Sequence, residues 1–173
     1  MKGIIIFKGK YGATHQYASW LSAILNIKAL VAGTETTEQL KEADYVILGT
    51  SIYIGKLQLK NWIEKHQLLL QKKKLYLFLV CGTPVDETEK LQGYITANVP
   101  AEIRIRCDCY FYPGKLEFKK LSFIDKLLLT IGAKLARSRG EEIHLEDYNH
   151  VKRENLDALV NAVNIQIKTA VAS

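Results

Sequence analysis

Residues 4–15 read IIIFKGKYGATH, a continuous apolar run followed by a loop that contains two glycines. The run from Ile4 to Phe7 has no polar face, as expected for a parallel strand that is covered on both sides. Apolar residues then recur at helical spacing and predict a helix over residues 14–26: Tyr17, Trp20, Leu21, Ile24 and Leu25. A buried strand that leads through a glycine loop into an amphipathic helix indicates an α/β fold.

The rest of the chain continues this alternation of strands and helices. Residues 45–48 and 75–80 are apolar throughout and predict two more central strands. Residues 27–31, interrupted by Lys28, and residues 103–109, which alternate apolar with mostly charged side chains, predict edge strands. Further helices are predicted over 36–42, 58–72 and 86–97, and at the C-terminus from Leu156 to Ile167. This order predicts a doubly wound, five-stranded parallel sheet of order 2-1-3-4-5 with helices on both faces.

Length and composition set the class of protein. The 173 residues, 48% hydrophobic and 24% charged, predict a single domain over residues 1–173 with one sizeable core. Three cysteines are too few for a disulfide framework, which favours a reducing, cytoplasmic location. Neither a secretory signal nor a membrane-spanning run is expected, because no apolar stretch approaches about 18 residues.

The loop after the first strand is the first candidate binding element. In an open parallel sheet, ligands bind beyond the carboxyl ends of the strands at the switch point, here between the first and third strands. Gly9 and Gly12 let backbone amides approach an anion, Thr14 adds a hydroxyl at the helix start, and Lys8 and Lys10 add positive charge. A phosphate cradle is one interpretation, and an ordinary glycine turn into a helix is the other.

The loops after the third and fourth predicted strands end at the same edge. Residues 49–57 supply hydroxyls, a glycine and Tyr53, which could lie against a planar ring, and residues 81–86 supply small residues. Three such loops describe a site for a phosphate-bearing aromatic cofactor. The alternatives are that Tyr53 anchors its loop and that Cys81 is an ordinary strand-end residue. Nucleotide fingerprints of the Walker A or GxGxxG type are absent from the sequence.

Several segments together resemble the flavodoxin-like flavoprotein superfamily. Within it they are similar to the branch that includes the menaquinone-dependent protoporphyrinogen IX dehydrogenases. The resemblance rests on Gly12-Ala13-Thr14, on residues 49–53 with Gly55, on Asp147-Tyr148 ahead of Val151, and on residues 111–116 followed by 123–126.

The resemblance implies noncovalent FMN, with the phosphate group near residues 9–14 and the isoalloxazine between residues 50–55 and 81–83. The candidate cofactor-binding residues are Lys8, Gly9, Lys10, Tyr11, Gly12, Ala13, Thr14, Thr50, Ser51, Ile52, Tyr53, Gly55, Cys81, Gly82 and Thr83. No catalytic side chain is assigned, because the flavin would supply the redox chemistry.

Three functions follow from this site. The first is an FMN-dependent oxidoreductase, with oxidation of a porphyrinogen and a quinone acceptor as its sharper form. The second is a soluble flavodoxin-type electron carrier that serves protein partners. The third is a flavodoxin-like interaction module without flavin. Lys8 and Gly9 leave this function open, because flavodoxins usually have hydroxyl residues at the start of the phosphate loop.

Residues 115–139 form a basic apolar segment. They hold seven basic and two acidic residues, a net charge of +5 out of +6 for the chain, interleaved with aliphatic residues. A basic amphipathic helix is expected, which either lies on an anionic membrane surface near a quinone or packs on the sheet. Nucleic acid is not an expected partner of this segment. Elsewhere in the chain, the spacing of the four histidines does not predict a metal site. The sequence leaves open whether the protein forms a homodimer.

Overall fold

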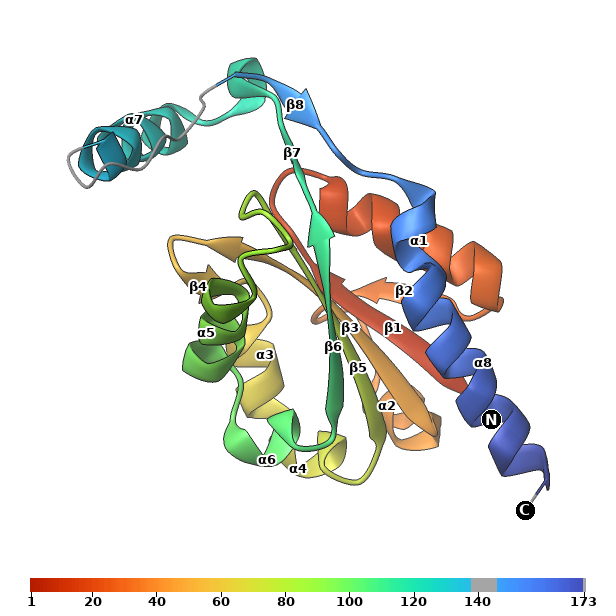
Figure 1. The fold of residues 1–173 in the computed structure, drawn as a ribbon. Coiled ribbons are helices and arrows are strands. Elements are labelled where there is room, and N and C mark those ends of the chain that lie inside the picture. Colours follow the sequence, from red (N-terminus) through yellow and green to blue (C-terminus); the bar gives the residue numbers. More distant parts are fainter. Residues whose placement is uncertain (138–145, 173) are drawn as a thin grey trace. The chain divides into compact units, whose positions relative to one another are not determined.

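The computed structural model describes residues 1–137 and 146–172, which fall into two compact units (Figure 1). The first unit comprises Met1–Gly114 and Val151–Ser173, and the second comprises Lys115–His150. Every strand of the large sheet belongs to the first unit, which is therefore the one that carries the predicted binding loops.

The large sheet has five parallel strands in the order β2-β1-β3-β5-β6. These are β1 (Gly3–Lys8), β2 (Lys28–Val31), β3 (Tyr45–Tyr53), β5 (Lys74–Cys81) and β6 (Cys107–Pro113). A short sixth strand, β4 (Lys56–Leu57), returns antiparallel to the end of β3. The order predicted from burial is confirmed, because the three central strands are those whose sequences are apolar throughout.

Helices cover both faces of this sheet, and each face has its own apolar core. One core joins β1, β3 and β5 to α1 (Ala13–Leu25) and α8 (Asp157–Ala172), with the short helix η2 (Arg153–Leu156) leading into α8. The other core lies under α2 (Thr37–Glu42), α3 (Lys60–Lys65), α4 (Gln67–Leu70), α5 (Thr88–Asn98) and α6 (Ala101–Arg104). Figure 1 shows α1 and α8 on one side of the sheet and α3 and α5 on the other.

Two sequence predictions on this unit need correction. The predicted edge strand over residues 103–109 is wrong at its start, because residues 101–104 form α6 and the strand begins at Cys107. Pro100 stands at the helix start, where its missing N–H costs nothing, and the alternating pattern misplaces Ile105, which is 81% exposed. The predicted helix over 58–72 is two short helices, α3 and α4, which meet at His66.

The described residues of the second unit, 115–137 and 146–150, form a small ribbon and one long helix. β7 (Lys115–Leu116) pairs antiparallel with β8 (Tyr148–Asn149), and the helical turn η1 (Phe118–Lys120) leads to α7 (Phe123–Arg137). Of the basic segment predicted to be helical over residues 115–139, Phe123–Arg137 form α7, whereas Lys115–Leu116 form a strand, and residues 138 and 139 lie outside the described part. Across residues 1–137 and 146–172, no helix combines the length and the apolar character that crossing a membrane requires.

Candidate functional site

The predicted binding loops follow strand ends that are neighbours in the sheet. Lys8 at the end of β1 is paired with Thr50 of β3, and Ser51 of β3 is paired with Val80 of β5. Adjacent strands lie about 4.8 Å apart, so the chain leaves the sheet at three neighbouring points. The structure therefore brings the three predicted loops to one edge.

The loop after β1 is folded tightly onto the start of α1. A Cβ atom at Gly9 would lie 2.4 Å from the Thr14 hydroxyl oxygen, so only glycine fits there. Gly12, at the helix N-cap, has a φ of 83°, a left-handed conformation that glycine adopts readily. Thr14 is 2% exposed, and Ala13 beside it is also buried.

No side chain of the first turn of α1 neutralises the partial positive charge at its N-terminus. Gly12 offers no side-chain cap, and the first turn of the helix contains no acidic residue. The first amides of a helix have no partner within the helix and carry partial positive charge. Exposed Lys8 and Lys10 add to this charge. The structure of the loop fits an anion such as a phosphate group.

Lys10, in the loop after β1, contacts Tyr53 at the end of β3. Its Nζ atom lies 3.7 Å from the centroid of the Tyr53 ring and 5.6 Å from that of the Tyr11 ring. A cation this close to an aromatic face is attracted by the quadrupole of the ring. The phosphate-type loop and the aromatic residue predicted to face a planar ring are thus in direct contact.

The end of β3 is held by the backbone around it. Thr50 is completely buried and its hydroxyl accepts a hydrogen bond from the Leu59 amide at 3.1 Å. The Ser51 carbonyl accepts one from the Gln58 amide at 3.0 Å, while Ile52 pairs with Leu57. The Thr50 hydroxyl therefore fixes the chain that returns from the loop. Tyr53 is half-buried at the end of the strand.

A two-residue turn closes the β3–β4 hairpin. Tyr53 pairs with Lys56, and the residues between them, Ile54 and Gly55, have φ angles of 50° and 70°. Two successive left-handed residues define a type I′ turn. Gly55 suits that conformation, whereas Ile54 is a β-branched residue in a region that such residues rarely occupy.

Asn98 is a positioning residue that the sequence analysis missed. It is 4% exposed at the end of α5, and its side-chain oxygen accepts from the Leu57 amide at 3.2 Å. Its amide group donates to the carbonyls of Gly55 at 3.0 Å and Tyr94 at 2.9 Å. The helix thereby fixes the hairpin that carries Tyr53. The only sequence signal was a polar residue at the apolar end of a helix.

The third loop begins at the end of β5. Cys81 is buried, and burial raises the pKa of its thiol, which keeps it protonated at neutral pH. Its Sγ atom donates to the Thr83 carbonyl at 3.7 Å, and its own carbonyl accepts from the Gly114 amide at 2.9 Å. Gly82 is exposed and Thr83 is half-exposed. The thiol is a structural group here, and the exposed backbone of residues 82–83 is the part that could meet a ligand.

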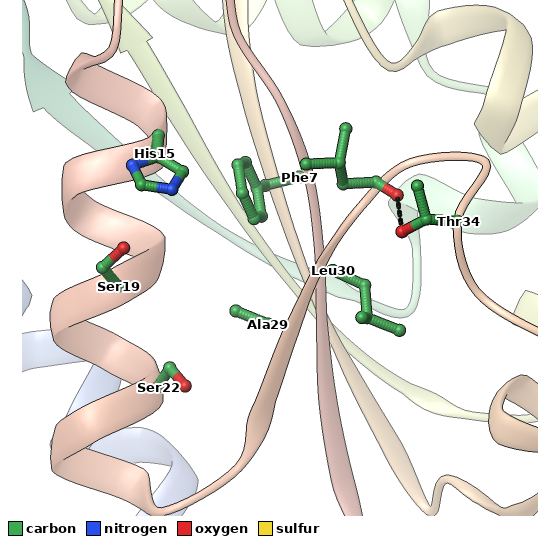
Figure 2. Close-up of a pocket in the computed structure, with 8 residues that line it drawn as sticks. Phe7, His15, Ser19, Ser22, Ala29, Leu30 and Thr34 are labelled. Atoms are coloured by element: carbon green, nitrogen blue, oxygen red, sulfur yellow. Dashed lines mark hydrogen bonds between the residues drawn. The ribbon is translucent and has the colours of Figure 1, made fainter.

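A shallow hollow of about 460 Å³ lies between α1 and the strands β1 and β2 (Figure 2). Figure 2 shows His15, Ser19 and Ser22 along α1, on the side toward Ala29 of β2. The Ser22 hydroxyl already donates to the Ile27 carbonyl at 2.6 Å, and none of the predicted site residues lines the hollow. The hollow is therefore separate from the three-loop site.

The chain matches a family model and is similar to several solved structures. The family model of the flavodoxin domain matches residues 4–142. The Trp repressor binding protein from Bacillus subtilis is 14% identical with a TM-score of 0.47, over 65% of this chain and 85% of that one. A WrbA-like flavodoxin from Agrobacterium tumefaciens is 15% identical with a TM-score of 0.43, over 82% and 100%. An azoreductase from Bacillus anthracis is 11% identical with a TM-score of 0.43, over 81% and 98%. No curated protein matches the chain with significance.

Proposed function

Because the chain belongs to the flavodoxin domain family, we propose that it binds FMN at the carboxyl ends of β1, β3 and β5 and transfers electrons. One observation carries this proposal. The loop after β1 closes on the start of α1 through Gly9, and the helix N-terminus there has neither a side-chain cap nor an acidic residue. Such a terminus is suited to a phosphate group.

Different residues of the proposed site would bind the phosphate and the isoalloxazine of FMN. The amides of residues 10–14 and the Thr14 hydroxyl would hold the phosphate, and Lys8 and Lys10 would add attraction for its charge. Tyr53 would offer its ring to the isoalloxazine, held in place by the hairpin that Asn98 fixes. The exposed backbone of Gly82 and Thr83 would meet the other edge of the ring system. FMN, when bound, supplies the redox chemistry.

A Gly9→Ala variant tests the phosphate loop. The added methyl group would lie within 2.4 Å of the Thr14 hydroxyl oxygen and force the loop away from the helix. We expect the affinity for FMN to fall about ten-fold or more, equivalent to about 1.4 kcal/mol. Fluorescence titration of the protein with FMN measures this directly.

Two comparisons make the test specific. Riboflavin lacks the phosphate, so the Gly9→Ala change should weaken FMN binding more than riboflavin binding. Gly93 lies within α5, and a Cβ atom there would meet nothing within 4 Å, so Gly93→Ala is the matched control and should leave both affinities unchanged. Absence of saturable FMN binding by the unaltered protein would overturn the proposal and favour the flavin-free interaction module.

The finer proposal is that the protein oxidises a porphyrinogen and passes the electrons to a quinone. It is supported by the sequence resemblance and by the apolar, basic character of α7, which suits a membrane-soluble acceptor. The FMN-loaded protein should then oxidise protoporphyrinogen in the presence of menaquinone. Reduction and reoxidation of the flavin without turnover of these two compounds would instead favour the electron carrier.

A further inference from the structure

Helix α7 presents an apolar face to solvent. Five large side chains on it are exposed: Phe123 by 82%, Ile124 by 65%, Leu127 by 51%, Leu128 by 38% and Ile131 by 46%. At about 100° per residue, they share one sector of about 140° of the helix circumference. Asp125 and Ala133, each 4% exposed, lie on the opposite side. The face that is open to solvent is thus distinct from the face that is buried.

Hydrogen bonds define the start of α7. The Ser122 hydroxyl accepts a hydrogen bond from the Asp125 amide at 3.2 Å, and the Ser122 carbonyl accepts one from the Lys126 amide at 3.0 Å. Serine is a preferred N-cap residue because its hydroxyl satisfies one of the first helical amides. Upstream, the Phe118 amide donates to the Asp147 carboxylate at 2.7 Å, which ties η1 to the segment before β8. These hydrogen bonds fix where the helix begins and link η1 to the segment before β8.

Positive charge borders this face. Within residues 115–137 the sequence has six basic and two acidic residues. Glu117 pairs with Lys115 and Lys120, and Asp125, the one acidic residue in the sequence of α7, is buried. Lys134 is exposed, and the Lys126 Nζ atom lies 5.6 Å from the centroid of the Phe118 ring. At about 100° per residue, Lys134 lies inside the apolar sector, about 20° from Phe123, and Lys126 lies about 60° beyond Phe123, outside the sector. The Lys126 Nζ atom also donates to the Lys119 carbonyl at 3.5 Å.

An apolar face with basic residues beside it favours binding to a lipid surface over a membrane-spanning helix or a contact with a second copy of the chain. A helix of 15 residues is about 22 Å long and is too short to cross a hydrocarbon core of about 30 Å. Contact with a second copy through the same face would bring like charges together, whereas anionic lipid would neutralise them. Apolar helices with a basic border lie in the plane of a membrane interface.

We propose that α7 binds the surface of an anionic lipid bilayer, with its exposed apolar face inserted and with Lys126 and Lys134 at the headgroups. This inference is independent of flavin binding. The test is co-sedimentation of the full chain with vesicles of phosphatidylcholine, alone or mixed with phosphatidylglycerol. We expect binding to the mixed vesicles at low salt, at least ten-fold less binding at high salt, and little binding to phosphatidylcholine alone.

Matched variants locate the surface. Phe123→Ser with Leu127→Ser should reduce binding to the mixed vesicles at least ten-fold. Leu68→Ser with Ile165→Ser is the control, because these side chains on α4 and α8 are similarly exposed, by 79% and 65%, and should not affect binding. Lys126→Gln with Lys134→Gln should weaken binding and reduce its dependence on salt. Circular dichroism and thermal unfolding check that each variant folds like the parent chain.

Three results would overturn the proposal. One is no co-sedimentation of the parent chain with the anionic vesicles. Another is equal loss of binding in the α7 pair and in the control pair. The third is a dimer in light scattering that the Phe123→Ser, Leu127→Ser pair converts to a monomer while vesicle binding persists, which would assign the face to a second copy of the chain.

Discussion

At the scale of single residues, Glu35 is a buried charge in the first unit with two short hydrogen bonds. Its side chain is 4% exposed and accepts hydrogen bonds from the Trp62 indole and the Gly33 amide, both at 2.7 Å. Burial by itself would raise the pKa of Glu35, but these hydrogen bonds outweigh burial and lower the pKa below its usual value. The ionised carboxylate therefore stabilises the connection between β2 and α2.

Replacing Glu35 by Gln should destabilise the protein by about 1–3 kcal/mol at neutral pH, since one of the two donors then faces an amide N–H group instead of an oxygen. A lowered pKa contributes stability above the ordinary value near pH 4.3, and this contribution is lost as the pH falls through the lowered pKa. The difference between the parent chain and the variant should therefore shrink on acidification. Urea unfolding at neutral pH and below about pH 4 measures it.

Glu64→Gln is the control for Glu35. The Glu64 side chain is 49% exposed and its carboxylate lies 4.0 Å from the Lys60 ammonium, a surface pair worth less than about 1 kcal/mol. This variant should change the free energy of unfolding little at either pH. If Glu35→Gln behaved in the same way, the buried hydrogen bonds would not be a source of stability.

Residue types and order were enough to predict that the three candidate loops lie at one edge of the sheet, but not to predict their contacts. Gly9 and Gly12 were identified from the sequence because a glycine loop between a buried strand and a helix is a local pattern. The contact between Lys10 and Tyr53 joins residues 43 positions apart, and the role of Asn98 depends on α5 lying beside β4. Such contacts depend on the tertiary fold and have no local signature.

At the scale of elements, the β3–β4 hairpin combines a favourable turn with an unfavourable residue. Ile54 has a φ of 50° and is 63% exposed, so its side chain gains little burial in return for the strained backbone. Asn tolerates this left-handed conformation and is favoured in type I′ turns. Ile54→Asn should therefore stabilise the protein by about 0.5–1 kcal/mol in urea unfolding.

The control for the turn is Val85→Asn. Val85 is 51% exposed and is not among the residues with a positive φ, so the same chemical change should leave the stability nearly unaltered. A loss of stability in Ile54→Asn would mean that the side chain contributes more than the backbone strain costs. Because Tyr53 precedes the turn, FMN titration of this variant also reports whether the hairpin geometry matters for binding.

Element types were predictable where hydrophobic periodicity was long, and less so where it was short. The central strands and α1 are long, uniform patterns, and their predicted positions are confirmed. Residues 103–109 alternate like a strand, yet Ile103 is buried from the one-turn helix α6 and the edge strand starts later. A short alternating run is compatible with either periodicity, and here the proline before it and the tertiary packing decide.

At the scale of the whole molecule, the two units differ in how they are stabilised. Both large apolar clusters consist of residues from the first unit, including Val151, Leu156 and Leu159 after the second unit. The Tyr17 hydroxyl donates to the Pro113 carbonyl at 3.0 Å and accepts from the Asn155 amide at 2.9 Å. The two chain segments that flank the second unit are thus both fastened to α1, within the first unit.

This arrangement predicts that residues 117–147, most of the second unit, can be removed without unfolding the first unit. Leu116 pairs with Tyr148, so residues 117–147 can be replaced by an Asn-Gly turn that closes the β7–β8 ribbon. The shortened chain keeps both clusters and every predicted cofactor-binding residue. Its thermal midpoint should shift by less than about 4 °C, and its affinity for FMN should match that of the full chain.

The same shortened chain separates the two proposed activities. It lacks α7, so it should lose binding to anionic vesicles while it retains flavin, because the three loops of the proposed cofactor site all belong to the first unit. Calorimetry, FMN titration and vesicle co-sedimentation on one preparation measure all three properties. A chain that fails to fold would show that the second unit stabilises the sheet, and loss of FMN from a folded chain would place part of the cofactor site in residues 117–147.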